Sequence, residues 1–222
     1  MDIRIADEVG SLVLLGAMEL DGCAVGPSGE ELLRRMEARE AALREAWVGR
    51  GPGEIPVLQP ARRLYRSARL DPTRERPSSE ALLRRILKGG ALPRINSAVD
   101  LCNLCAVSYF LSIGLYDRDR LAPPLEVGLG GPGERYAGLG KPDVHLAGRL
   151  RCRDRLGAFG NPSSDSLRSS VDESSTRLLW LIYAPADYDP ARLEEHLAWS
   201  ARQALECGLC GEAGRPRLIA AS

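Results

Sequence analysis

The stretch from 157 to 170, GAFGNPSSDSLRSS, gathers side chains that could bind a small polar ligand and activate water. Asp165, Ser166 and Arg168 supply a carboxylate, a hydroxyl and a guanidinium within four residues. Asn161 stands before a proline, which favours a turn, so a loop between two apolar runs is expected. Such loops often carry function on a rigid scaffold. They also form as solvated loops held by their own side-chain-to-backbone hydrogen bonds, and both interpretations stay open.

A second polar pair interrupts an apolar stretch that reads as a buried helix from about 97 to 111. Asp100 and Asn103 are three residues apart, so they share one face of that helix. A carboxylate in apolar surroundings needs a partner, because burying an unpaired charge is costly. The partner is either a ligand or the chain itself, through a nearby backbone turn or Arg94.

The six cysteines include two CxxC pairs, Cys102/Cys105 and Cys207/Cys210, whose four thiolates match the ligand set of a structural zinc site. However, the first pair lies within the apolar stretch, where free cysteine is a common small core residue. The setting favours buried thiols over zinc. We expect no metal and no other cofactor.

Other motifs argue against several enzyme classes. The only histidines are His145 and His196, and the chain has no GxSxG nucleophile elbow, HExxH motif or P-loop. Glycines 128, 130 and 133 have the spacing of a dinucleotide-binding loop. A proline interrupts that spacing and no helix follows, so a dinucleotide site is not expected.

Hydrophobic periodicity predicts the elements that must position these side chains. A Ser28–Glu31 capping box predicts the start of an amphipathic helix that continues to Trp47. Further helices are expected at 61–70, 78–88, 97–111 and 190–207, strands at 3–6, 12–20, 112–117, 125–129 and 177–185, and a pair of strands within 145–154. Without a regular βαβ alternation, this order indicates an α+β fold.

Composition sets broad limits on function. The chain has 222 residues, of which 44% are hydrophobic, so it can bury a sizeable core. Its 30 Lys and Arg residues balance 30 Asp and Glu residues, which argues against non-specific DNA binding. We see no signal peptide and no apolar run long enough to span a membrane, so a cytoplasmic location is expected.

Several short motifs occur in a characteristic order: Arg94-Ile95-Asn96, Val99-Asp100-Leu101 with Asn103, Tyr116-Asp117 before Leu121, Gly133-Glu134, and the segment 157–177 with Thr176 near its end. As an ordered set over about residues 60 to 185, they resemble the B3/B4 domain of the phenylalanyl-tRNA synthetase beta subunit, in its free-standing form. The chain departs from that family at two positions. Gly114 stands where the family has a histidine, and Ile182 stands where it has a glutamate. The helix at 189–207 also replaces a family Thr-Asp-Ala segment.

The resemblance implies a single α+β domain over 1–222, with mixed and antiparallel sheets, flanking helices, and residues 1–59 packed on the core as N-terminal strands and a helix. It implies hydrolysis of a mischarged aminoacyl-tRNA ester by an oriented water. The expected catalytic residues are Asp165, Glu134 and Ser166. The expected binding residues are Asn96, Asp100, Asn103, Asn161, Arg168 and Thr176.

The leading expectation is therefore a free-standing editing protein that binds the acceptor end of tRNA and acts in trans, not a complete tRNA ligase. The alternative is a non-catalytic module for RNA or for a small amino-acid-like ligand, and a third possibility is a hydrolase of another ester or amide. Zero net charge and a closed pocket would favour the small ligand. A basic face would favour RNA, formed by Arg62, Arg63, Arg66, Arg84 and Arg85.

Overall fold

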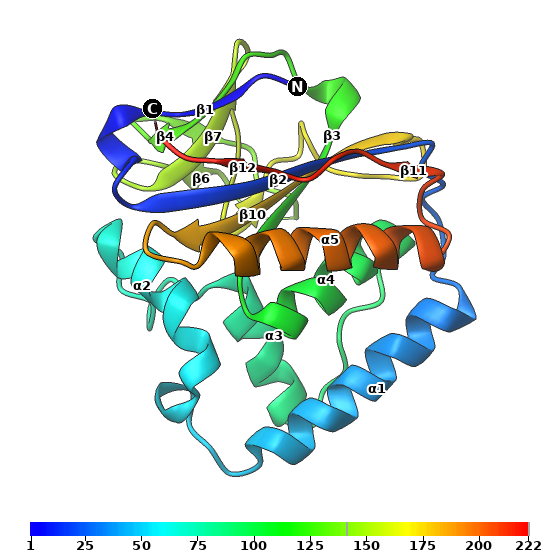
Figure 1. Cartoon of the computed structure of the whole chain (residues 1–222). Helices are drawn as coiled ribbons and strands as arrows, with labels where there is room; N and C mark the ends of the chain where they lie inside the picture. The colour runs from blue at the N-terminus through cyan, green and yellow to red at the C-terminus, as the bar shows by residue number, and fades with distance from the viewer. Residues whose placement is uncertain (141, 222) are drawn as a thin grey trace.

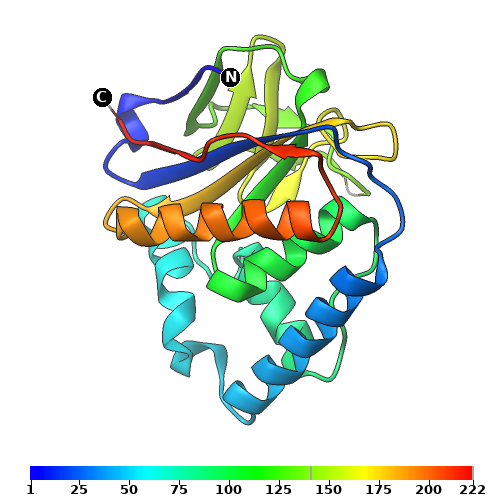
Figure 2. The same cartoon turned by 45° about the vertical axis from the view of Figure 1, so that its right-hand side comes forward.

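The structure is a computed structural model that describes residues 1–140 and 142–221. It has three layers: helices, a central sheet, and a second sheet (Figure 1). Turning the molecule by 45° shows the same order, with the helices on one side of the central sheet and both chain termini near the second sheet (Figure 2). The prediction of an α+β fold with mixed and antiparallel sheets is confirmed: one five-stranded sheet is mixed, and the other five-stranded sheet and a small two-stranded sheet are antiparallel.

The helices lie close to their predicted ranges. They are α1 (Glu30–Trp47), α2 (Gln59–Ser67), α3 (Ser78–Leu87), α4 (Ser97–Tyr109) and α5 (Pro190–Glu206), with 3₁₀ turns η1 (Asp7–Val9), η2 (Pro52–Glu54), η3 (Pro56–Leu58) and η4 (Arg118–Arg120).

The predicted strands are also confirmed, as β1 (Ile3–Ile5), β2 (Val13–Asp21), β3 (Ser112–Asp117), β4 (Leu125–Leu129), β6 (Val144–His145), β7 (Leu150–Asp154) and β10 (Arg177–Pro185). The sequence did not predict the remaining strands, which are β5 (Arg135–Tyr136), β8 (Gly157–Asn161), β9 (Ser164–Asp165), β11 (Glu212–Ala213) and β12 (Arg217–Ile219). The central sheet has the order β11-β2-β10-β3, with β12 also on β2, and the second has the order β1-β4-β7-β8-β9.

After the exposed Arg177, strand β10 is buried on both faces, which explains the unbroken apolar sequence LLWLIYAP from 178 to 185. It pairs antiparallel with β2 over nine residues and with β3 over six. Its side chains alternate between two cores. Leu178, Trp180 and Ile182 face the helices, while Leu179, Leu181 and Tyr183 face the second sheet.

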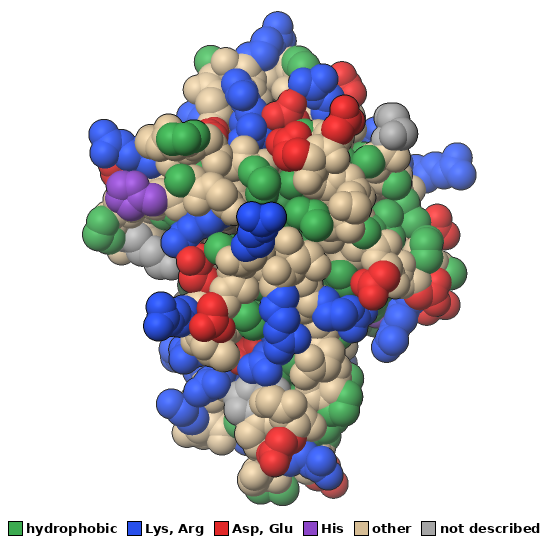
Figure 3. All heavy atoms as spheres, turned by 90° about the vertical axis from the view of Figure 1, so that its left-hand side faces the viewer, with side chains coloured by type: hydrophobic (Ala, Val, Ile, Leu, Met, Phe, Trp, Pro, Cys, Tyr) green, Lys and Arg blue, Asp and Glu red, His purple; other side chains and the backbone are tan. Residues whose placement is uncertain are grey.

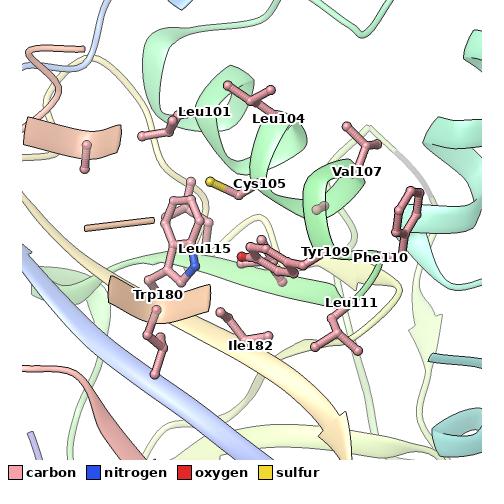
Figure 4. Close-up of a cluster of buried hydrophobic side chains, with 14 of the residues drawn as sticks. Leu101, Leu104, Cys105, Val107, Tyr109, Phe110, Leu111, Leu115, Trp180 and Ile182 are labelled. Atoms are coloured by element: carbon pink, nitrogen blue, oxygen red, sulfur yellow. The ribbon is translucent and has the colours of Figure 1, made fainter. Parts of the chain in front are cut away.

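Helix α4 covers the helical face of the sheet. Leu101, Leu104 and Cys105 of α4 pack in the same core as Leu115 of β3 and Trp180 of β10 (Figure 4). The helix is apolar on most sides, which suits a helix packed between the sheet and other helices.

Two sequence predictions need correction. Helix α1 begins at Glu30 with Gly29 at the N-cap, and Ser28 instead donates its hydroxyl proton to Asp100, so the predicted capping box does not form. The stretch from 157 to 170 is not one long loop. It begins as β8 and continues through a turn into β9, because main-chain pairing satisfies most of its first half.

No helix in the described part of the chain is long and apolar enough to cross a membrane.

Between the two sheets, the Tyr116 ring lies against two glycines. A Cβ on Gly114 would stand 2.3 Å from the Tyr116 hydroxyl, and one on Gly160 would stand 2.4 Å from its ring. The ring cannot move away easily, because it is fully buried and its hydroxyl shares a 3.0 Å hydrogen bond with Tyr183. Both glycines are therefore required by close packing.

We expect Gly160→Ala to lower the free energy of unfolding by about 1–3 kcal/mol, because the new methyl group overpacks this core. Urea unfolding followed by circular dichroism measures the loss. Gly26→Ala is the matched control, since a Cβ there meets no atom within 4 Å. An equal loss in both variants would contradict the packing role of Gly160.

Candidate functional site

A slot of about 110 Å³ opens where α3 and α4 meet the edge strand β3. The segments around β9 close its remaining side. Two predicted site residues, Asn103 and Asp165, line this slot together. The other lining residues are Ser78, Leu82, Val99, Cys102, Ala106, Ile113, Leu115, Leu139, Ser170 and Val171.

Helix α4 presents the floor of the slot. Val99, Cys102, Asn103 and Ala106 line it, and their spacing of three and four residues places them on one helical face. Asn103 is therefore held by a regular helix, and the side chains beside it are small. This arrangement leaves an amide group next to an apolar surface.

The β8–β9 hairpin presents Asp165 from the other side. Its position is fixed by main-chain bonds: Asp165 pairs with Gly160, and its carbonyl oxygen accepts a 3.1 Å hydrogen bond from the Leu139 amide. The Leu167 amide donates to the Ala137 carbonyl at 2.9 Å. The side chain of Asp165 is exposed at the mouth of the slot.

The surroundings of the slot disfavour the ionised form of its cysteine, Cys102. Burial raises the pKa of Cys102 well above its ordinary value, and the nearby Cys105 and Asp165 raise it further. A thiol must ionise to act as a nucleophile or to bind zinc, so Cys102 is suited to neither task. The Asp165 carboxylate is the acid–base group that the described part of the slot offers.

Asn161 and Arg168, two predicted binding residues, hold the hairpin instead. The Asn161 side-chain oxygen accepts from the Ser163 and Ser164 amides at 2.7 and 2.8 Å, which forms the turn. Arg168 donates two hydrogen bonds to Asp154, at 2.9 and 3.0 Å. The Arg168 guanidinium also reaches the carbonyl oxygen of Gly157.

The buried Asp154 carboxylate explains why Arg168 is engaged. Burial raises the pKa of Asp154, but hydrogen bonds from Arg168 and from the Ala122 and Leu156 amides outweigh it and lower that pKa below its ordinary value. The carboxylate is therefore ionised at neutral pH, and it needs the guanidinium beside it.

Asn96, Asp100 and Ser166 also make contacts within the chain. Asn96 caps α4 by accepting from the Val99 amide at 2.9 Å. Asp100 accepts from the Ile95 amide at 2.8 Å and is buried, so its partner is the chain. The buried Ser166 accepts from the Arg168 amide at 3.1 Å.

The last two predicted site residues lie outside the slot. Glu134 accepts from the Gly131 amide at 2.9 Å and lies 3.4 Å from the Arg151 guanidinium. Thr176 is exposed, and its carbonyl oxygen accepts from the Cys23 amide at 2.8 Å. Neither residue lines the slot that Asn103 and Asp165 share.

The two positions that depart from the synthetase pattern lie on opposite faces of the central sheet. Strand register pairs Gly114 with Leu181, whereas Ile182 pairs with Ile113. Ile182 packs in the core between the central sheet and the helices, on the same face of the sheet as the slot. On the Gly114 face, Tyr116 occupies the space that a larger side chain at 114 would need.

Both CxxC pairs belong to or border the core between the central sheet and the helices. Burial raises the pKa of Cys105 to about 12, and Cys207 of the other pair raises it as well. Cys210 lies opposite Cys23, because the neighbouring residues 22–24 and 209–211 exchange main-chain hydrogen bonds. In the part of the chain that the structure describes, no three His, Cys, Asp or Glu residues gather to hold a metal ion.

Sequence reasoning did not single out Leu139 and Val171 as slot residues, and it treated Ser78 only as a helix start. The repeat of small or polar side chains at 99, 102, 103 and 106 could have marked the floor. Nothing local marks Leu139, because it reaches the slot through its pairing with Asp165.

Comparison with known proteins gives a family match over more than half of the chain. The family model described as the B3/4 domain matches residues 61–187. A solved structure, the N-terminal fragment of the phenylalanyl-tRNA synthetase beta-subunit from Pyrococcus horikoshii, is similar with a TM-score of 0.48 and 12% sequence identity. That match covers 99% of this chain and 50% of the other, so this chain spans about half its length. No curated protein matches.

The ion pair between Arg168 and Asp154 allows a test of whether Arg168 stabilises the fold or binds a ligand. We expect Arg168→Met to lower the free energy of unfolding at neutral pH by about 3 kcal/mol, because it leaves a buried carboxylate unpaired. This figure is the low end of the range for buried pairs, since Arg168 is itself partly exposed.

The pH dependence follows from the lowered pKa of Asp154. Its stabilising contribution is complete above the unfolded pKa of about 3.9 and is lost as the pH falls through the lower native pKa. The difference between wild type and Arg168→Met should therefore shrink in acid. Urea unfolding at several pH values measures it, with the exposed Arg155→Met as control. A difference that is constant with pH would contradict the pair's role.

Proposed function

Because this chain belongs to the B3/4 domain family, we propose that it removes amino acids from mischarged tRNA in trans, in the cytoplasm. The observation that carries the proposal is the slot in which Asn103 and Asp165 meet over an apolar floor. A carboxylate and an amide beside an apolar surface are the groups that recognition and hydrolysis of an aminoacyl ester require.

The size of the slot supports a small group as its occupant. Its volume of about 110 Å³ is below the ~300–1,000 Å³ typical of sites that enclose a whole drug-sized ligand. The apolar side chains of Val99, Ile113 and Leu115 line it, so an amino-acid side chain fits this surface. The RNA then lies outside the slot.

Asp165 is proposed as the general base. Its carboxylate accepts a proton from water, and the water oxygen attacks the ester carbonyl carbon. The bond between that carbon and the ribose oxygen breaks, and the ribose hydroxyl leaves with the proton. The Asn103 amide donates a hydrogen bond to the carbonyl oxygen as negative charge develops there.

A non-catalytic ligand-binding module is the second candidate. The observation that favours it is the engagement of Ser166, Glu134 and Arg168 in contacts within the chain. Of the three residues that the sequence marks as catalytic, Asp165, Glu134 and Ser166, Asp165 alone lines the slot in the described part of the chain. A slot with one acid–base group could bind an amino-acid-like ligand without hydrolysing an ester.

We expect Asp165→Asn to slow deacylation of the cognate mischarged tRNA by about 10²–10⁴-fold, because it removes the proton acceptor. Asn103→Ala should slow it by about 10²–10³-fold, the usual loss for one oxyanion donor. Release of labelled amino acid from a panel of correctly and incorrectly charged tRNAs measures both rates.

Glu173→Gln is the matched control, because this exposed acid lies close in sequence to the slot but does not line it. Wild-type rates in Asp165→Asn would overturn the role of Asp165. No deacylation by the wild type across the panel, with a slot-dependent binding of free amino acid in calorimetry, would favour the second candidate.

A further inference from the structure

The solvent-facing side of α3 forms an open, cationic hollow of about 440 Å³. None of the described residues that line it is acidic. They are Arg76, Ala81, Arg84, Arg85, Lys88 and Gly90. Ala81, Arg84 and Arg85 of α3 and Lys88 at its C-cap repeat at three and four residues, so the three cations form a stripe along one face of the helix.

A second hollow, of about 420 Å³, continues this surface to the end of α1. It shares Arg84 and Lys88 with the first and adds Arg50 and the half-buried Trp47. No acid is among its described lining residues. We name the two hollows together the α3 groove. Lys and Arg side chains are also frequent over the helical lower half of the face shown in Figure 3.

The acid of α3, Glu80, does not line the groove, although one of its carboxylate oxygens lies 3.9 Å from the Arg84 guanidinium. Glu80 is buried and accepts two hydrogen bonds from the buried Arg62, at 2.7 and 2.8 Å. Arg62 therefore does not contribute to a basic face, contrary to the sequence-based expectation, and the exposed Arg63 pairs with Asp187. Of the predicted face, Arg84 and Arg85 remain in the groove.

The groove adjoins the slot on the same helix. Ser78 and Leu82 of α3 line the slot, and Arg84 to Lys88 lie about 3–9 Å farther along the helix axis. A nucleic-acid strand rises about 3.4 Å per nucleotide. A strand whose end enters the slot would therefore place its next one to three phosphates beside these cations.

We propose that the α3 groove binds the phosphate backbone of the RNA strand whose aminoacylated end enters the slot. The inference rests on the proposed function. The planar guanidinium group of arginine can donate two parallel hydrogen bonds to the oxygens of one phosphate. The Trp47 ring offers a stacking surface for a base, as in proteins that bind single strands. A row of cations with an aromatic ring at its end suits RNA better than an acidic peptide.

The test measures binding of a fluorescein-labelled, uncharged tRNA by anisotropy at several salt concentrations. Uncharged tRNA separates binding from hydrolysis. We expect Arg84→Glu/Arg85→Glu/Lys88→Glu to weaken binding at least ~10-fold and to flatten the slope of log K against log salt by about 2, because three phosphate contacts are lost.

Two further variants separate the loss of phosphate contacts from misfolding and from a change in overall charge. Arg76→Gln/Lys88→Gln removes cations that make no ion pair with described residues, so it should keep the fold and flatten the slope by about 1. Arg153→Glu/Arg202→Glu/Arg215→Glu reverses three exposed cations outside the groove and should bind tRNA as the wild type does.

Equal losses in both triple variants would overturn the proposal, as would a wild type that does not bind tRNA. Competition by poly-glutamate as effective as that by RNA would also overturn it, in favour of a protein partner. Groove-dependent tRNA binding without any deacylation would uphold the groove and overturn the proposed hydrolysis.

Discussion

The fold depends on burying both faces of β10. A strand that is apolar on both sides must be covered twice, so the central sheet carries helices on one face and a second sheet on the other. Strand β3 is the edge of that sheet. The segment after β9 covers this edge: the Asp117 amide of β3 donates a 3.0 Å hydrogen bond to the Ser169 carbonyl oxygen. The slot lies at this seam between helices, edge strand and hairpin.

Most polar side chains of the stretch from 157 to 170 stabilise the local fold. Asn161 forms its turn, Arg168 neutralises Asp154, and the Ser169 hydroxyl donates to the Phe159 carbonyl at 2.6 Å. These bonds stiffen the hairpin that carries Asp165. A rigid support matters for a general base, because misplacing a catalytic group by about 1 Å costs rate. The structural and functional interpretations of this stretch therefore apply to different residues within it.

Local pattern was enough to predict the helices, the long strands and the α+β class, because periodicity and capping are short-range signals. It also allowed the interpretation of Asp100 as a group that holds a backbone turn. The pairing of Asn103 with Asp165 in one slot was not predictable, since 62 residues separate them and only the sheet order brings them together. Arg168 was misleading for the same reason, because its partner Asp154 lies on β7, on the other side of the β8–β9 hairpin in the sequence.

A net charge of zero did not limit local charge, and burial explains why. Among the described residues the core holds five acids, Glu40, Glu80, Asp100, Asp117 and Asp154, but only two arginines, Arg62 and Arg151. Internal hydrogen bonds satisfy acids such as Glu80 and Asp154. Removing more acids than bases from the surface leaves cations in excess there. A chain that is neutral by composition can thus present a cationic groove to solvent, beside a slot whose acid–base group is a carboxylate.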